Sequence, residues 1–512
     1  MKTNSKAAVM LLVLVTLFFS PVDAATRLTI LHTNDTHSRM LPFESKQHGP
    51  DCGGIVRRAG LIEHIRSQEG EILLLDAGDI LQGTPFYSIF KGEACYRTAK
   101  ACGYDATTLG NHELDNDLGN LQARLAETGM RLLCCNVLFA GTKRPVFAPY
   151  HVFIRNGLKI GVIGSIGNEA WESIDRKIRA PMTHQDQIEA VRATARRIRP
   201  HVDLVVLLSH AGLEFDEQTA AAVGEIDLLI GGHTHVELAQ PKLAVNSAAA
   251  GACNNGLNGT LVAQAGEWGH FVGRVDLLIE DDGRIASWSG SLIKVTSEFE
   301  HLAPASLVQM VSEYDQKLQK IMNEVLGQTP ADLDFPKDER KKALLPMGSF
   351  IAAGMRDAAG SDICIVNSGA IRTDLKAGEL TRGEIYEAVP YDNTVVTFTM
   401  TGAAVQKMLD FVAANFGDPD GYQFAGVTGV FNRKTGRAEN VMIGNEPLSP
   451  TKTYRVSTSS FMANGNIAGD KLFTDPQKIE DSGVFMRDAA EGLLKKLGTL
   501  PDYRELPFKL QS

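Results

Sequence analysis

The stretch "TLGNHELDN", residues 108–116, places an Asn and a His side by side after a glycine, with an Asp three residues beyond the His. It continues the run "YDATTL", whose β-branched residues predict a strand. Taken alone, the segment is either a polar turn or a loop that binds metal and carries catalytic groups. The ends of the other predicted strands decide between these two interpretations.

Four further predicted strands in the first half also end in polar residues. In open α/β sheets, ligands bind just beyond the carboxyl ends of the strands. Residues i and i+2 of an extended chain point the same way, which predicts convergence within the pairs 35/37 and 233/235. Together with "GNH", these strand ends supply seven candidate ligands: Asp35, His37, Asp79, Asn111, His210, His233 and His235.

Carboxylates, imidazoles and one amide, without a thiolate, are suited to two divalent ions such as zinc, manganese, cobalt or iron. A pair of metals needs a shared carboxylate, for which Asp79 is the natural candidate. The alternative for any single residue is a polar cap at a strand end. Such residues at five strand ends favour the metal site.

The alternation of seven short apolar runs with helical segments such as "QIEAVRATARRIR" predicts a layered α/β domain over residues 25–295. Residues 296–334 are expected to form a linker region with a bridging helix, or else a helix within one domain. Residues 335–512 predict a smaller mixed α/β domain. The helix should start after Ser306 and stop at Gly327, with an apolar face at steps of three and four: Leu307, Val311, Tyr314, Leu318, Ile321 and Val325.

Residues 1–24 have the layout of a secretory signal peptide: Lys2 and Lys6, an apolar run over 7–19 and the small-residue pattern "VDA". An uncleaved membrane anchor is the alternative. A periplasmic or secreted protein without stable membrane insertion after cleavage is therefore expected. Export permits disulfides, and the seven Cys are expected to form one or two structural bridges, with the others free and buried.

The net charge of −10 becomes −11 once residues 1–24 are removed. An acidic chain is a poor non-specific binder of nucleic acid, so a polymeric nucleic-acid partner is not expected. The residues indicate no oligomeric state.

The motifs "HTNDTH", "DAGD", "GNHELD", "SHAG" and "GGHTH", in this order, resemble the series of the calcineurin-like metallophosphoesterases. With its second half, the chain resembles the secreted 5′-nucleotidase family, which includes UDP-sugar hydrolases. The resemblance implies one metal held by Asp35, His37, Asp79 and His235. It implies a second held by Asp79, Asn111, His210 and His233.

The resemblance also implies that His112 and Asp115 are the catalytic pair. In extended chain, His112 would face away from its neighbour Asn111 and toward the substrate. An imidazolium there can stabilise charge on the phosphoryl oxygens. Asp115 can hold the ring and favour its protonated form.

In the second half, "NSGAIR", "PYDN" and "SSFMANG" resemble the substrate-binding motifs of that family. They imply that Asn367 and Arg372 bind substrate and that Tyr391 and Phe461 sandwich a nucleobase, against the alternative that both aromatics are core residues. Arg suits a phosphate or carboxylate because of its bidentate fork.

Two further substrate residues are implied at positions where the chain departs from the family pattern. Lys341 stands where an Arg is expected, with Arg340 beside it. In "FMANGNIAGD", residues 466–468 are inserted before Gly469 and Asp470, which puts the contact of Asp470 with sugar hydroxyls in doubt.

The expected function is hydrolysis of nucleoside 5′-monophosphates to nucleoside and phosphate by water activated at two metals. UDP-sugars, nucleoside di- or triphosphates, 2′,3′-cyclic nucleotides or a sulfur ester are alternative substrates on the same scaffold. A nucleotide-binding protein without catalysis is the alternative from another class, against which the intact ligand set argues. A hinge near residues 296–335 is expected because metal and substrate contacts lie in different halves.

Overall fold

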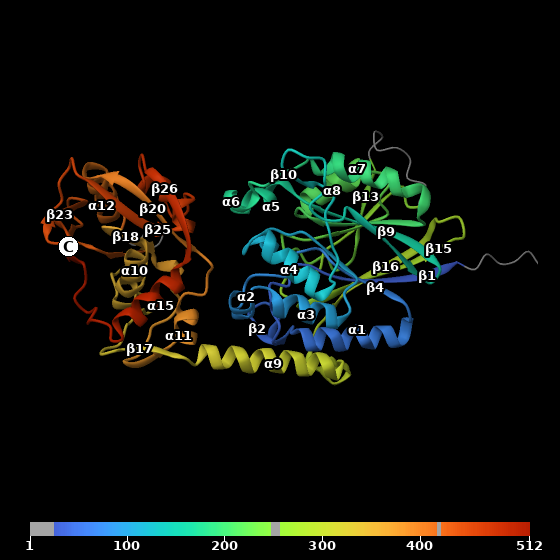
Figure 1. Cartoon of the computed structure of the whole chain (residues 1–512), viewed down its shortest axis with the longest axis horizontal. Helices are drawn as coiled ribbons and strands as arrows, with labels where there is room; N and C mark the ends of the chain where they lie inside the picture. Colours follow the sequence, from blue (N-terminus) through green and yellow to red (C-terminus); the bar gives the residue numbers. More distant parts are fainter. Residues whose placement is uncertain (1–24, 247–255, 417–420, 512) are drawn as a thin grey trace, which may run out of the picture. The chain divides into compact units, whose positions relative to one another are not determined.

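The computed structural model describes residues 25–246, 256–416 and 421–511 (Figure 1). The predicted signal peptide lies outside the described residues. The chain divides into two units, Met1–Val311 and Ser312–Ser512, and the division falls within helix α9, Ala305–Met322. In the part of the chain that is described, no helix has both the length and the apolar character needed to cross a membrane.

Two six-stranded sheets form the centre of the first unit. The first has the order β16-β15-β1-β4-β5-β6, with bounds Ile285–Lys294, Phe271–Ile279, Thr26–Thr33, Ile72–Asp76, Ala106–Thr108 and Leu132–Leu133. The second has the order β13-β14-β12-β11-β9-β8, with bounds Lys242–Val245, Gly259–Ala263, Leu228–Gly231, Leu204–His210, Leu158–Ile166 and Tyr150–Arg155. The inner strands β1, β4, β5 and β6, and β9, β11, β12 and β14, run parallel.

The two sheets pack face to face, because Leu28 and Leu73 of the first share one buried cluster with Val162 and Val206 of the second. Helices lie on the two outer sides (Figure 1): α7, Gln187–Ile198, and α8, Leu213–Ala222, on one, and α1, Ile55–Glu69, and α3, Glu93–Cys102, on the other. The layered α/β architecture predicted for this half is confirmed, and all seven predicted strands are present.

The connections of the first unit carry short elements. These are β2 Phe43–Ser45, β3 Gly49–Cys52, α2 Pro85–Phe90, η1 His112–Leu114, α4 Leu118–Thr128, β7 Val137–Phe139, α5 Asn168–Ser173, α6 Arg176–Arg179, β10 Met182–His184, η2 Arg199–His201 and η3 Ser297–Leu302.

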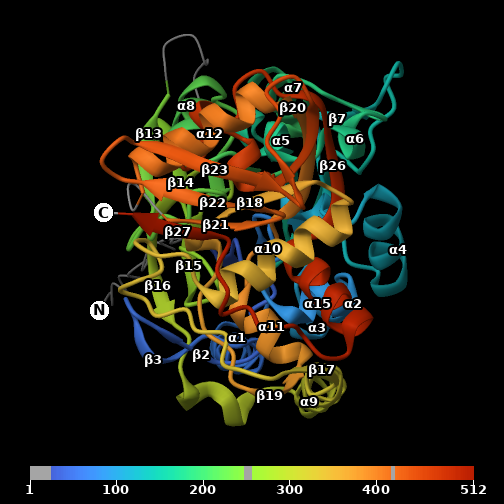
Figure 2. The ribbon, with the colours of Figure 1, turned by 90° about the vertical axis from the view of Figure 1, so that its left-hand side faces the viewer.

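The second unit is built on a five-stranded sheet of order β21-β18-β25-β20-β26, with bounds Tyr422–Ala425, Ile363–Asn367, Thr453–Ser459, Thr394–Thr401 and Gln477–Phe485. Helices α10, Pro346–Ala359, and α15, Met486–Leu497, cover one face, and α12, Gly402–Ala414, covers the other (Figure 2). Helices α10 and α12 and strands β18, β20 and β25 confirm the mixed α/β character predicted for the second half.

A four-stranded sheet, β24-β23-β22-β27, completes this unit, with bounds Glu446–Pro447, Arg437–Ile443, Val427–Asn432 and Phe508–Gln511. The remaining elements are β17 Val325–Thr329, η4 Ser368–Ala370, β19 Gly378–Thr381, α11 Arg382–Ala388, α13 Ser460–Ala463 and α14 Gly469–Leu472.

The predicted end of the linker helix is wrong. Helix α9 stops at Met322, and Val325 and Gly327 lie in strand β17, which pairs with β19. Gly327 has a different role: a Cβ there would come within 2.6 Å of the Gly498 carbonyl oxygen. The glycine is needed for close approach of two backbones, a requirement that depends on a partner far away in the sequence.

The expected disulfides are absent from the described residues. Six cysteines are free and buried: Cys52, Cys95, Cys102, Cys134, Cys135 and Cys364. Cys253 lies outside the described part of the chain. Burial raises the pKa of the Cys95 thiol to about 12 and that of Cys102 to about 11. These thiols are therefore inert packing groups, because a thiol reacts as its thiolate.

Candidate metal centre and a second pocket

The predicted ligands gather where strands of the two sheets of the first unit end. Asp35 follows β1 by two residues, Asp79 follows β4 by three and Asn111 follows β5 by three. From the second sheet, His210 is the last residue of β11, and His233 follows β12 by two. The structure therefore brings together donors that the sequence separates by nearly two hundred residues.

Two groups of three side chains each have ligand atoms within 4.8 Å of one another: Asp35, His37 and His235, and Asp35, Asp79 and His210. In the first group, His235 Nε2 lies 3.3 Å from Asp35 Oδ1 and 3.3 Å from His37 Nε2. In the second, His210 Nε2 lies 3.2 Å from Asp79 Oδ2.

The other two predicted ligands border the second group. Asn111 Oδ1 lies 3.2 Å from His210 Nε2, and the His233 ring centroid is 5.2 Å from that of His210. The two groups share Asp35, whereas the resemblance gives the shared position to Asp79. Asp79 also faces His37: burial lowers the pKa of His37, and the Asp79 carboxylate is the strongest charge that opposes this.

The donor set fits divalent cations. Asp35 and Asp79 are buried, and within the described ranges neither pairs with a Lys or Arg. Two neighbouring buried carboxylates need positive charge beside them, because an uncompensated buried charge is costly. Carboxylate, imidazole and amide donors at this spacing supply a site for such ions.

The backbone at this centre takes a route that the local sequence pattern does not predict. Five of the ligands have positive φ angles, a region that non-glycine residues rarely occupy: Asp35 at 50°, His37 at 46°, Asp79 at 56°, His233 at 77° and His235 at 57°. Strained backbone of this kind concentrates at functional sites. Asp35 and His37 do lie close together, but not along an extended strand, so the reason given for this prediction is wrong. The same reason is wrong for His233 and His235.

Long-range backbone hydrogen bonds hold this conformation. The Asp35 amide donates to the Gly78 carbonyl at 2.9 Å, and the His37 amide donates to the Asp79 carbonyl at 3.0 Å. The Trp268 amide donates to the Asp35 carbonyl at 2.7 Å. The loops after β1 and β4 thus stabilise one another, which fixes the directions of both aspartates.

Within the stretch "TLGNHELDN", residues His112–Leu114 form a short 3-10 helix, η1. The prediction that His112 faces away from Asn111 in an extended chain is therefore also wrong. The helical turn instead places His112 Nδ1 2.8 Å from Asp115 Oδ2, with both side chains about 30% exposed. Burial lowers the pKa of His112, but the carboxylates of Asp115 and Asp79 outweigh it and raise the pKa to about 10. The Asp115 carboxylate therefore holds the His112 ring beside the candidate ligands and favours its protonated form.

Glu113 supports the loops of this centre, a role that the metal-binding motifs do not predict. Its buried carboxylate accepts hydrogen bonds from the backbone amides of Asp79 and Gly110 at 2.9 and 2.8 Å, and of Ile80 at 2.9 Å. A Cβ at Gly110 would lie 2.1 Å from Asp79 Oδ1, so only glycine fits between these loops. Its position beside His112 in "GNHE" was the available signal.

Replacing Glu113 with Gln should destabilise the first unit by about 1–3 kcal/mol, because an amide nitrogen leaves some of these buried donors without an acceptor. Urea denaturation of metal-depleted protein measures the effect. Metal affinity should fall by about 10- to 100-fold, as it does when groups that orient ligands are lost. Glu63→Gln, at a partly exposed ion pair with Arg66, is the control. An unchanged free energy of unfolding and an unchanged metal affinity would exclude Glu113 as a residue that positions the ligand loops.

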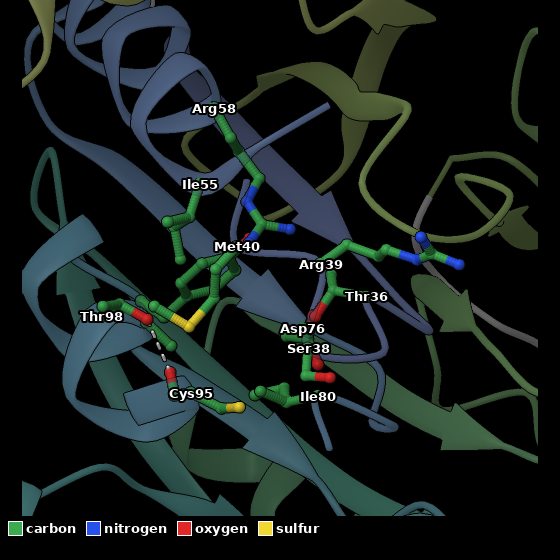
Figure 3. A pocket seen from close by; sticks show the side chains of 12 residues that line it. Thr36, Ser38, Arg39, Met40, Ile55, Arg58, Asp76, Ile80, Cys95 and Thr98 are labelled. Carbon is green, nitrogen blue, oxygen red and sulfur yellow. Dashed lines mark hydrogen bonds between the residues drawn. The ribbon is translucent and has the colours of Figure 1, made fainter. Parts of the chain in front are cut away.

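A second buried carboxylate, Asp76, ties the ends of three strands together. It accepts from Thr33 Oγ1 at 2.6 Å, from Thr107 Oγ1 at 3.0 Å and from the Gly78 amide at 2.9 Å. A cavity of about 10 Å³ lies beside it, between Arg58 of α1 and Cys95 of α3 (Figure 3). That volume is the size of one water molecule, so the cavity is a packing gap rather than a substrate site.

The second unit contains a larger cavity of about 360 Å³. The side chains and backbone that line it are Asn367, Gly369, Ala370, Tyr391, Asn393, Phe461 and Ile467. Tyr391 is 44% exposed and Phe461 is 39% exposed, so neither ring is a core residue. Asn367 is buried, and its Oδ1 has no hydrogen-bond partner among the described residues.

The other three predicted substrate residues do not line this cavity. Arg372 lies near it, with Cζ 5.9 Å from the centroid of the Tyr391 ring. Lys341 and Asp470 are both exposed. The structure therefore groups Asn367, Tyr391 and Phe461 directly and leaves Lys341 and Asp470 outside the lining.

Arg487, which no sequence motif points to, fixes the loop that carries Tyr391. Its guanidinium is buried, donates to the Tyr391 carbonyl at 3.1 Å and pairs with Asp392. Its Cζ lies 4.7 Å from the ring centroids of Tyr386 and Phe485. An exposed aromatic has little packing of its own, so this buried clamp sets its position.

Comparison with known proteins agrees with this geometry. Residues 28–237 match the family model described as calcineurin-like phosphoesterase, and residues 325–473 match the 5′-nucleotidase C-terminal domain. The chain is 29% identical to Protein UshA of Yersinia enterocolitica and 28% identical to a 5′-nucleotidase of Vibrio cholerae. These matches cover 89% of this chain in both cases, and 89% and 88% of the relatives.

Solved structures extend the similarity to the fold of the whole chain. A 5′-nucleotidase precursor from Thermus thermophilus has a TM-score of 0.63 and 26% identity, and the match covers 95% of this chain and 100% of the other. The two family matches occur in the same order as the two units. The chain therefore belongs to the two-domain 5′-nucleotidase family of phosphoester hydrolases, in which a calcineurin-like phosphoesterase domain precedes a 5′-nucleotidase C-terminal domain.

Proposed function

We propose that this protein hydrolyses nucleoside 5′-monophosphates to nucleoside and phosphate, with two divalent metal ions bound in its first unit. The observation that carries the proposal is the convergence of seven metal-binding donors beside the His112–Asp115 pair. The exposed aromatics of the cavity in the second unit supply the preference for a nucleoside.

Asp35, His37, Asp79 and His235 would hold one ion, and Asp79, Asn111, His210 and His233 the other. The Asp79 carboxylate lies 3.2 Å from His210 Nε2 and opposes the lowering of the His37 pKa by burial, which supports its assignment as the shared ligand. When bound, the ions would supply Lewis-acid stabilisation of the phosphoryl oxygens and lower the pKa of a water molecule. Zinc and manganese both suit these donors.

His112 and Asp115 act on the substrate from the chain itself. The His112 imidazolium donates a hydrogen bond from Nε2 to a phosphoryl oxygen, where negative charge increases in the transition state. Asp115 holds the other ring nitrogen, at 2.8 Å, and keeps the ring protonated. The charge at Nε2 therefore needs no reorganisation during the reaction.

Tyr391 and Phe461 are assigned to the nucleobase, Asn367 to a polar group of the nucleoside, and Arg372 to an anionic group. Lys341 and Asp470 are weaker candidates because both are exposed and outside the cavity lining. The metal donors lie in the first unit and the aromatic cavity lies in the second, so a hinge near residues 296–335 is part of the proposal.

Replacing either aromatic with Ala should raise KM for AMP by roughly 5- to 150-fold, because stacking one base is worth about 1–3 kcal/mol. The kcat for ribose 5-phosphate, which has no base, should not change. Steady-state kinetics of Tyr391→Ala and Phe461→Ala measure both values, with exposed Leu510→Ala as the control. An unchanged KM in both variants would exclude base stacking in this cavity.

A hydrolysis panel tests the proposed substrate class. AMP, ATP, UDP-glucose and 2′,3′-cyclic AMP should be compared at equal metal concentration. We expect AMP to have the highest kcat/KM. The volume of about 360 Å³ is at the lower end for ligand pockets and suits one nucleoside. A higher kcat/KM for UDP-glucose or the cyclic nucleotide would make that compound, rather than the monophosphate, the preferred substrate. Absence of hydrolysis across the panel would favour a nucleotide-binding protein without catalysis.

We also propose that the protein is periplasmic or secreted. The support is the layout of residues 1–24, with two lysines, an apolar run and a small-residue cleavage pattern. N-terminal sequencing of the protein from its natural cells should start at residue 25. A protein that begins at residue 1 would contradict cleavage.

A further inference from the structure

One wall of the 360 Å³ cavity comes from Ile467, in the segment of residues 466–468. Ile467 is half-buried and lines the cavity together with Tyr391 and Phe461. The backbone there is unusual: Ile467 has φ 51° and Ala468 has φ 57°. A left-handed conformation is rare for any residue with a Cβ and is a true outlier for a β-branched one. Such strain persists only where the surroundings enforce it.

The surroundings of Ile467 do enforce it. Tyr422, which is fully buried, donates from its hydroxyl to the Ile467 carbonyl at 3.1 Å. Asn466 Nδ2 donates to the Phe461 carbonyl at 3.0 Å, which ties the inserted residues to one of the two aromatics. At Gly469, a Cβ would lie 2.0 Å from the Met462 carbonyl oxygen, so the chain returns tightly against α13. Ile467 is therefore a fixed part of the wall.

The lining of this cavity offers polar groups but no charged ones. The polar side chains in the lining are the carboxamides of Asn367 and Asn393, and the phenol of Tyr391. Asp470, the acidic residue that follows the insertion, is exposed and outside the lining. No carboxylate or basic group is part of the lining. A ligand hydroxyl that faced Ile467 would lose its water and gain no partner.

We propose that Ile467 is a specificity-determining residue that contacts the nucleoside. Because of Ile467, the pocket selects its ligand by apolar contact with the base rather than by hydrogen bonds to a sugar hydroxyl. This inference rests on the proposed nucleotidase function and names the substrate class of that site more narrowly. Nucleoside 5′-monophosphates with ribose and with 2′-deoxyribose are both substrates.

Kinetics of two variants test the contact. Ile467→Ala removes most of the wall. Ile467→Gly removes all of it and relieves the left-handed strain, so that its folding is favoured. Both should raise KM for AMP about tenfold or more, as loss of apolar contact in a pocket does, with kcat unchanged. Ala468→Gly relieves the same strain next to the wall without lining the cavity, and should leave KM unchanged.

Comparison of AMP with 2′-deoxy-AMP in the unaltered enzyme tests the selection. A site built to bind a hydroxyl rejects the analogue that lacks it by about 10⁴-fold or more. Here kcat/KM for the two substrates should differ by less than about tenfold. A larger loss for 2′-deoxy-AMP, or an unchanged KM for AMP in both Ile467 variants, overturns this inference while the nucleotidase function stands. Failure of the unaltered enzyme to hydrolyse AMP, with activity on another phosphoester, instead overturns the proposed function.

Discussion

Replacing His112 with Ala should lower kcat for AMP by several hundredfold or more, in line with the 10²–10⁴-fold that a positioned acid or base contributes. The imidazolium lies beside the metal centre, and its charge is maintained by Asp115 at 2.8 Å. An alanine offers no hydrogen bond to the phosphoryl oxygens, so the loss falls on the transition state and appears in kcat.

Metal content separates this role from ligation. His112→Ala should retain both ions in elemental analysis, because His112 is outside both groups of converging ligands. Asp115→Asn should have a smaller effect of the same kind, since the ring remains but loses its charged partner. His301→Ala, at an exposed histidine of η3, is the control. Loss of metal from His112→Ala would identify His112 as a metal ligand. An unchanged kcat would exclude a catalytic role for His112.

Replacing Asp35 with Asn should have a still larger effect, about a thousandfold or more in kcat/KM, because each lost metal contributes several kcal/mol to stabilising the phosphoryl charge. Asp35 is the one carboxylate present in both groups of converging side chains. The amide preserves size but loses the charge, so the ion that Asp35 would hold together with His37, Asp79 and His235 should bind more weakly.

Elemental analysis and activity at increasing metal concentration measure this prediction. Partial recovery of activity at high metal concentration would agree with weakened binding. Asp282→Asn, on an exposed turn, controls for the loss of one negative charge. Full metal content with full activity in Asp35→Asn would exclude Asp35 as a ligand and leave Asp79 as the carboxylate that holds the second group.

The strands and the identity of the donors could be predicted because both are local properties of the sequence. Short apolar runs define β1, β4, β5, β11 and β12, and the polar residues that follow them define the donor set. The route of the loops could not be predicted in this way. The left-handed angles at Asp35 and Asp79 depend on hydrogen bonds between the loops after β1 and β4, which lie about forty residues apart in the chain.

The same reason explains the supporting residues that were missed. Glu113 has a role only because the loop containing Asp79 and Ile80 turns its amides toward it. Arg487 has a supporting role only because α15 begins beside the loop that carries Tyr391. The boundary of α9 was misplaced because Val325 continues a helical spacing, although its pairing with β19 takes it into a strand.

The most direct test of the central claim is a metal titration of chelator-treated protein, with phosphate release from AMP as the readout. We predict that metal-free protein is inactive and that activity returns with zinc or manganese, saturating at two ions per chain, because the donors form two groups that share the Asp35 carboxylate. Full activity in the metal-free protein, or saturation at a single ion, would contradict the account of a two-metal phosphohydrolase.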